Sequence, residues 1–230
     1  MLARRLFYPI CLLVGALLAV VAGVAHPDLA GDGAAQLATI AQCSAWRAIH
    51  WTFLFGFPLA LTGLVGLARI HAGNPGESAV RAGLIVGTFA YGAWTVTVAF
   101  MGAAGWSLAH SFTVAEAGMT ATRAVFMFDM IHPFALTTQR VAGFALGLST
   151  CLFGWGVSDG KVLPRWLGTG GLAAGAVAMA LALAFREDTK ADQAAFVLPV
   201  LWQVLTGVLL LARSDANDAP GPPVRRVGAA

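Results

Sequence analysis

The sequence predicts an all-α membrane protein, a polytopic bundle of about six transmembrane helices with a further interfacial helix on its outer face. Composition is the first reason. Of the 230 residues, 58% are hydrophobic and only 11% are charged, whereas soluble domains carry roughly 25% charged residues. The second reason is that the apolar residues gather into segments close to the roughly 20 residues that a helix needs to cross a bilayer core.

Six segments are apolar enough to span. In chain order they are Leu6–Ala25, Thr52–Ala68, Gly83–Gly105, Pro133–Val157, Leu167–Phe185 and Ala194–Leu211. The first also has signal-peptide features, with Arg4 and Arg5 before the apolar run and small residues at its end. Because this run is longer than a usual signal core, a retained helix is favoured. One domain is expected over residues 1–212, followed by a disordered cytoplasmic tail over residues 213–230, which are polar and rich in proline.

Lysine and arginine predict the orientation, because they collect on the cytoplasmic side of membrane proteins. With the N-terminus inside, the inner side holds Arg4, Arg5, Arg69, Arg81, Lys161, Arg165, Arg213, Arg225 and Arg226, and the outer side holds Arg47, Arg123, Arg140, Arg186 and Lys190. Both termini are therefore expected in the cytoplasm. The net charge is only +3 and it flanks apolar segments, so a nucleic-acid partner is not expected.

Three glycine pairs spaced four residues apart predict close helix packing. They are Gly83 with Gly87, Gly143 with Gly147, and Gly171 with Gly175. Small residues at this spacing let helix backbones approach one another. The approach is expected either within the chain or in self-association between copies.

The connection Trp106–His132 is expected to form an ordered lid on the outer face. Its segment Thr113–Ile131 mixes apolar and charged residues and is predicted to be a helix lying in the interface. Pro133 disfavours helical geometry at the residue before it, so a break is expected at His132. The apolar run Ala124–Phe128 would be costly to leave in water.

A metal site on the outer side is one interpretation of the histidines. Its candidate ligands are His50, His110, Asp129 and His132, because imidazoles and carboxylates bind zinc, copper or iron. The other interpretation is that these are ordinary interfacial residues, since no paired ligand spacing is present. A haem needs two axial ligands at compatible depth. His71 lies at the opposite face from His50, so a haem between them is not favoured.

No motif for enzyme chemistry is found. The sequence has no nucleophile elbow and no P-loop, so no catalytic or cofactor-binding residues are assigned. The expected spans carry essentially no interior charge, which argues against a proton pump.

One hairpin resembles a known family. The run Leu163-Pro164-Arg165-Trp166-Leu167-Gly168, after a short polar turn, resembles the hairpin of small six-helix bacterial membrane proteins of unknown function. The resemblance implies six helices in a bacterial inner (plasma) membrane and implies no activity.

The function expected from these features is that of a non-enzymatic structural or accessory component that binds lipid or a partner. Two alternatives stay open: an outer-face metal-binding or redox protein, and a small-molecule carrier.

Overall fold

The computed structural model describes residues 2–114, 119–184 and 190–216, and within these ranges the chain is helical with no β-strand. The helices are α1 (Leu2–Ala25), α2 (Gly33–Gln42), α3 (Trp46–Ile70), α4 (Glu77–Phe100), the π-helix η1 (Met101–Gly105), α5 (Trp106–Val114), α6 (Met119–Asp159), α7 (Arg165–Ala184) and α8 (Lys190–Ala216). α8 thus enters the predicted tail, whose residues 217–230 lie outside the described ranges.

Six helical stretches among the described residues are long and apolar enough to cross a membrane. They are Leu6–Ala25, Trp46–Ile70, Glu77–Val114, Thr120–Asp159, Arg165–Ala184 and Gln193–Arg213. This confirms the predicted all-α polytopic bundle, and each stretch contains or closely matches one of the predicted segments.

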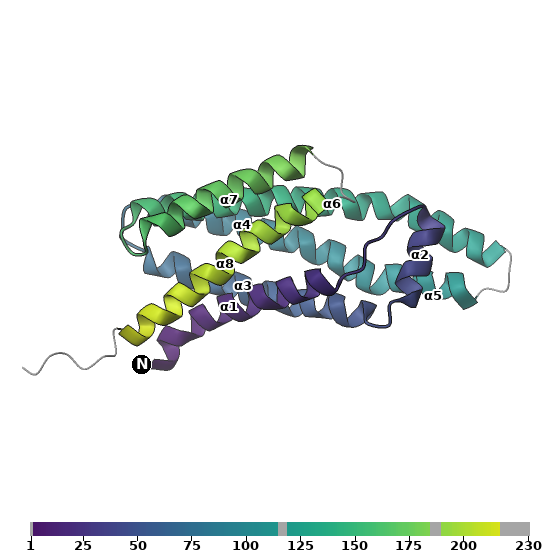
Figure 1. Ribbon diagram of the computed structural model, residues 1–230, viewed down its shortest axis with the longest axis horizontal. Helices are drawn as coiled ribbons and strands as arrows, with labels where there is room; N and C mark the ends of the chain where they lie inside the picture. Colours follow the sequence, from purple (N-terminus) through teal and green to yellow (C-terminus); the bar gives the residue numbers. More distant parts are fainter. Residues whose placement is uncertain (1, 115–118, 185–189, 217–230) are drawn as a thin grey trace, which may run out of the picture.

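The six spanning helices form a closed ring in the order α1, α3, α4, α6, α7 and α8, with α8 packed back against α1 (Figure 1). The start of α1 and the end of α8 lie at the same end of the molecule. The main core fills the ring, and its large members include Leu12, Phe57, Tyr91, Trp94, Leu146, Phe153, Val200 and Trp202. α1 is therefore an integral part of the bundle.

α6 and α7 approach each other closely, and glycine makes this possible. A Cβ on Gly154 would lie 2.5 Å from the backbone nitrogen of Leu172 and 2.7 Å from the carbonyl oxygen of Gly168. Gly147 lies against Gly175 in the same interface, whereas a Cβ on Gly143 would meet nothing within 4 Å. Most of the predicted glycines therefore lie at helix contacts within the chain. Self-association between copies stays a prediction.

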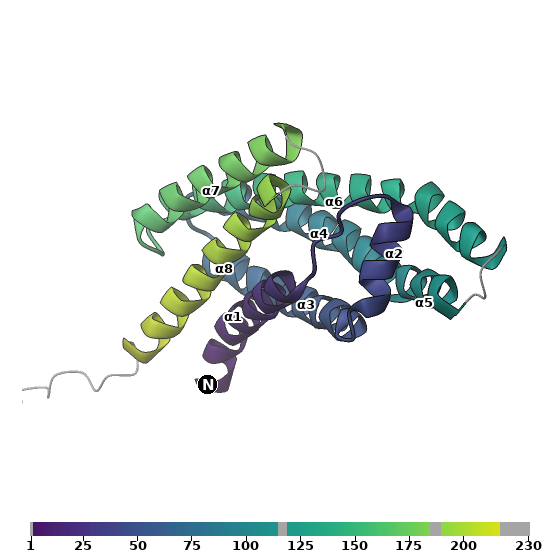
Figure 2. The same ribbon diagram turned by 45° about the vertical axis from the view of Figure 1, so that its right-hand side comes forward.

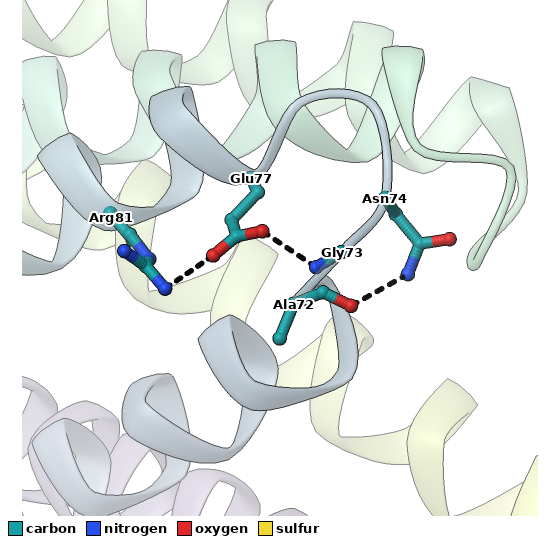
Figure 3. A network of polar contacts seen from close by, with 5 residues as sticks. All are labelled: Ala72, Gly73, Asn74, Glu77 and Arg81. Carbon is teal, nitrogen blue, oxygen red and sulfur yellow. Dashed lines mark hydrogen bonds and ion pairs between the residues drawn. The ribbon is translucent and has the colours of Figure 1, made fainter.

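Two tight turns lie at the end of the bundle that holds the termini. In the α3–α4 turn, the Glu77 carboxylate accepts a hydrogen bond of 2.6 Å from the backbone N–H of Gly73 and pairs with Arg81 one helical turn later (Figure 3). The side-chain amide of Asn74 donates to the carbonyl of Ala72 at 3.4 Å. The polar groups of this turn therefore largely hydrogen-bond or pair with one another.

The residues of the family resemblance build the α6–α7 turn. Leu163 is buried, and the backbone N–H of Leu167 donates to the carbonyl of Pro164 at 3.0 Å, which starts α7. Trp166 is exposed, at 55% of its maximal surface. This matches a turn whose tryptophan anchors at a membrane interface.

Two helical stretches are much longer than a bilayer core. α6 has 41 residues, or about 60 Å at 1.5 Å per residue, and the stretch Glu77–Val114 has 38 residues. The hydrocarbon core is about 30 Å thick. Both overshoot at the end opposite the termini, where the short helix α2 crosses them (Figure 2). We call α2, α5 and residues 119–132 of α6 the cap.

The structure corrects two predictions about this region. Thr113–Ile131 does not form a surface helix of its own, because its described residues end α5 and begin α6, and the helix that crosses this end is α2. The break predicted at His132 is also wrong, since α6 continues through Pro133. Phe128 and His132 before the proline and Ala135 after it are all buried, so packing on both sides holds the helix together.

A second hydrophobic core joins the cap to the start of α3 and to η1. Its buried members are Leu37, Ile40, Trp46, Met101, Ala109, Ala124 and Phe128. In the predicted lid segment, Ala124 and Phe128 are buried, while Phe126 and Met127 are 65% and 49% exposed. The apolar run Ala124–Phe128 therefore has one face in the cap core and one face outside it.

Candidate functional site in the cap

Trp46, the first residue of α3, anchors the junction between the bundle and the cap. Its indole is fully buried and donates a hydrogen bond of 2.8 Å to the carbonyl oxygen of Met101. Met101 opens the π-helix η1, and its carbonyl also accepts from the backbone N–H of Trp106. A carbonyl oxygen has two lone pairs, so both bonds can form. Short π-helical segments are frequent at functional sites.

His50 lies one turn after Trp46 on the same face of α3. Its Nδ1 donates to the carbonyl oxygen of Trp46 at 2.7 Å, and its side chain is only 3% exposed. Gly102 of η1 packs directly against it, since a Cβ there would lie 2.8 Å from the Cβ of His50. The carbonyl can only accept, so the hydrogen is on Nδ1 and the lone pair of the neutral ring is on Nε2.

His26 joins this pair from the end of α1. Its ring centroid is 5.0 Å from that of Trp46 and 5.4 Å from that of His50, and the Trp46 and His50 rings are 4.4 Å apart. The Nδ1 of His26 donates to the carbonyl of Pro27 at 2.8 Å. Burial lowers the pKa of His26, although the hydrogen bond to Pro27 and the charge of Asp28 oppose the shift. Burial thus favours the neutral form of His26.

Asp129, a residue of α6, lies against the N-terminus of α2. Its carboxylate lies directly against Gly33, the first residue of that helix, and any Cβ on Gly33 would clash with it. Asp32 caps the same helix, its side chain accepting from the backbone N–H of Ala35 at 2.9 Å. Carboxylates are favourable at a helix N-terminus, so Asp129 helps to dock α2 onto α6.

The other two predicted ligands lie in separate ring contacts. His132 is buried and stacks on Phe128, with centroids 4.5 Å apart. His110 is exposed and stacks on Trp106, with centroids 5.6 Å apart, and the guanidinium of Arg47 lies over the same indole. These contacts give both residues a structural role in the cap.

The four predicted ligands all lie in the cap or at its junction with the bundle, but they do not converge. Within the described ranges, no three His, Cys, Asp or Glu side chains lie close enough together to hold a metal ion. A haem between His50 and His71 has no geometric support either, because these residues lie at opposite ends of α3. The partner that His50 does have, His26, was not among the predicted ligands.

A second buried histidine lies at the opposite end of the molecule. His71 is fully buried after α3, and its Nδ1 donates to the carbonyl of Leu67 at 2.9 Å. Burial lowers its pKa, and the bond to Leu67 opposes the shift. Its Nε2 and the hydroxyl of Ser158 are buried without a hydrogen-bond partner among the described residues.

No family model, curated protein or solved structure matches this chain.

Proposed function

We propose that this protein is a non-enzymatic accessory component of a membrane and that it acts by binding a membrane-protein partner through its cap. The observation that carries the proposal is the overshoot of two helical stretches past the bundle. Of the roughly 60 Å of α6, only about 30 Å can lie in hydrocarbon. The remainder, with α2 and α5, builds a second packed body that spanning alone does not require.

An apolar face on α6 supports a partner at this position. Phe126, Met127 and Met130 are 65%, 49% and 66% exposed, and they lie within about one turn of the helix. The face continues along α6 into the spanning part, where Phe134 is 64% exposed. Apolar residues exposed beyond the hydrocarbon layer are typical of interaction surfaces. Continuity with the lipid-facing surface favours a partner that is itself in the membrane.

The interior of the bundle supports this function over that of a carrier. Phe57, Trp94 and Phe196 pack in contact in the ring, with Phe57 and Trp94 stacked at 5.9 Å. Beside them, the hydroxyl of Tyr91 donates to the amide oxygen of Gln203 at 2.6 Å, and both residues are buried. These polar groups bind each other and are not directed at a ligand.

Site-specific photocrosslinking in native membranes tests the proposal. A photoreactive amino acid is placed at Phe126 or Met130 of the cap, and at Ile85 of α4 as a matched control, since Ile85 is 72% exposed in the spanning part. We expect one defined protein adduct from both cap positions and only lipid adducts from position 85. Lipid adducts alone at all three positions would contradict a cap-bound partner.

We also infer that both termini are cytoplasmic and that the membrane is a bacterial plasma membrane. The excess of lysine and arginine at the end that holds the termini supports the orientation. Reporter fusions after Arg69 and Arg213 should read cytoplasmic, and fusions after Asp32 and Lys190 should read external. A cytoplasmic reading at Lys190 would contradict the topology.

A further inference from the structure

We propose that His26 and His50 together bind one zinc ion at the junction between the bundle and the cap. The two rings come from residues 24 positions apart in the chain, at the end of α1 and near the start of α3, and pack in one cluster with Trp46. This pair differs from the set that the sequence predicted, which lacked His26 and does not converge.

The hydrogen-bond pattern of both imidazoles is that of metal ligands. Each ring donates from Nδ1 to a backbone carbonyl, at 2.8 Å for His26 and 2.7 Å for His50. Metal-binding histidines almost always donate their other ring N–H to a carbonyl or carboxylate, which fixes the tautomer. Both Nε2 lone pairs are thereby left available, and among the described residues no protein group hydrogen-bonds to either of them.

The separation of the rings suits one shared ion. A zinc ion about 2.0–2.1 Å from an imidazole nitrogen lies roughly 3.2 Å from the ring centroid. For an ion bound by both Nε2 atoms, centroids 5.4 Å apart would subtend about 115° at the ion, close to a tetrahedral angle. Copper(II) favours square-planar coordination, which this angle fits less well.

The surroundings hold His50 in place before any ion arrives. Trp46 packs on its ring and is itself anchored by the bond to Met101, and Gly102 closes against its Cβ. His26 is less buried and follows the last residue of α1, so it can adjust to the ion. Asp28 contributes a negative charge near His26, which favours a cation at this place.

The site is open, because no third His, Cys, Asp or Glu joins the two imidazoles among the described residues. Water fills the two remaining positions of a tetrahedral ion, as one water does in catalytic zinc sites. The ion is therefore expected to exchange readily, unlike a structural zinc that is fully enclosed by protein.

Calorimetric titration with Zn²⁺ tests the proposal on the purified full-length protein, carrying no histidine tag, in detergent micelles. We expect one Zn²⁺ per chain for the wild type, and more than tenfold weaker binding for His26→Ala and for His50→Ala. The matched control His110→Ala removes an exposed histidine of the same cap and should bind as the wild type does. Co²⁺ in place of zinc should give the intense visible bands of a four-coordinate site, and both ligand variants should lose them.

Wild-type affinity in His26→Ala, or equal losses in His26→Ala and His110→Ala, would overturn the proposal. Because His50 is buried, His50→Ala is interpreted only if its thermal unfolding matches that of the wild type. His26 belongs to no helix, so His26→Ala keeps the proposal testable if His50→Ala fails to fold. The photocrosslinking at Phe126 and Met130 is a separate measurement. The proposed zinc site and the proposed cap-bound partner can therefore be contradicted independently.

Discussion

The spanning bundle and its junction with the cap differ in what their polar side chains do. In the bundle, polar side chains donate to groups of the same chain: Tyr91 to Gln203, Ser149 to the carbonyl of Gly83, and Thr97 to the carbonyl of Ala135. At the junction between the bundle and the cap, His26 and His50 each keep one ring nitrogen unbonded within the described part of the chain. Lipid offers no hydrogen bonds, so spanning helices must satisfy their polar groups internally. Toward the cap this constraint relaxes, and the two histidines of the junction can serve water or an ion.

The largest expected effect tests whether the core at the cap can open while the main core of the bundle stays folded. Trp46→Ala removes a fully buried indole and its bond to Met101. Truncating a buried aromatic side chain costs about 3–5 kcal/mol, and we expect the loss to appear as local opening of α2 and α5. Hydrogen exchange in nanodiscs should be faster in these helices and unchanged in α7 and α8.

Trp166→Ala is the control for this experiment, because Trp166 is exposed at the other end of the molecule. It should leave exchange in the cap unchanged. Faster exchange in α7 and α8 of Trp46→Ala would show that the two cores form one cooperative unit.

The packing of the bundle is tested by two glycines of the same helix. Gly154→Ala places a methyl group against the backbone of α7, which cannot move aside as a side-chain tip can. Overpacking of this kind costs about 1–3 kcal/mol. Gly143→Ala meets nothing within 4 Å and should be neutral or stabilising, by up to about 1 kcal/mol from helix propensity.

Thermal unfolding of the two variants in one detergent gives the comparison. A lower midpoint for Gly154→Ala and an equal or higher midpoint for Gly143→Ala are expected. Equal shifts in the same direction would mean that the α6–α7 approach does not limit stability.

The polar pair in the bundle should contribute less. Tyr91→Phe leaves the amide oxygen of Gln203 buried without its donor, and interhelical hydrogen bonds in membranes are worth about 1 kcal/mol. The double variant Tyr91→Phe, Gln203→Leu should recover part of the loss, because removing both partners leaves no unpaired group. A double variant that loses the sum of both single effects would indicate that the pair does not interact.

The smallest expected effect is a pH dependence of stability that arises at the junction between the bundle and the cap. Burial lowers the pKa of His26 in the folded protein, so the unfolded chain, whose histidine pKa is about 6.5, takes up its proton first as the pH falls. Stability is therefore complete above about pH 6.5 and decreases from there down to the lower folded pKa. Thermal unfolding with a chelator present should show a lower midpoint at pH 5 than at pH 8.

His26→Gln should flatten this dependence only in part, because burial lowers the pKa of His71 in the same direction. An unchanged pH dependence in His26→Gln would place the titrating group elsewhere.

The sequence predicted the bundle well, because each span is a run of apolar residues that can be read locally. It predicted an ordered connection over Trp106–His132 but not the form of the cap, since the continuity of a helix through Pro133, or from α4 into α5 through η1, depends on packing from other helices. The contact of His26 with His50 was missed for a similar reason. The Trp46-to-His50 spacing of one helical turn was visible, but nothing in the sequence indicates that α1 ends beside the start of α3.

The division into a spanning bundle and a cap outside the hydrocarbon core is tested most directly by the depth of two spin labels in nanodiscs. After Cys11, Cys43 and Cys151 are replaced, single cysteines at Phe126 and Ile85 are labelled, and their relaxation by oxygen and by a water-soluble nickel chelate is compared. Oxygen should dominate at position 85, in the hydrocarbon, and the nickel chelate at position 126, outside it. A label at position 126 that is as accessible to oxygen, and as protected from nickel, as the label at position 85 would contradict a cap outside the membrane core.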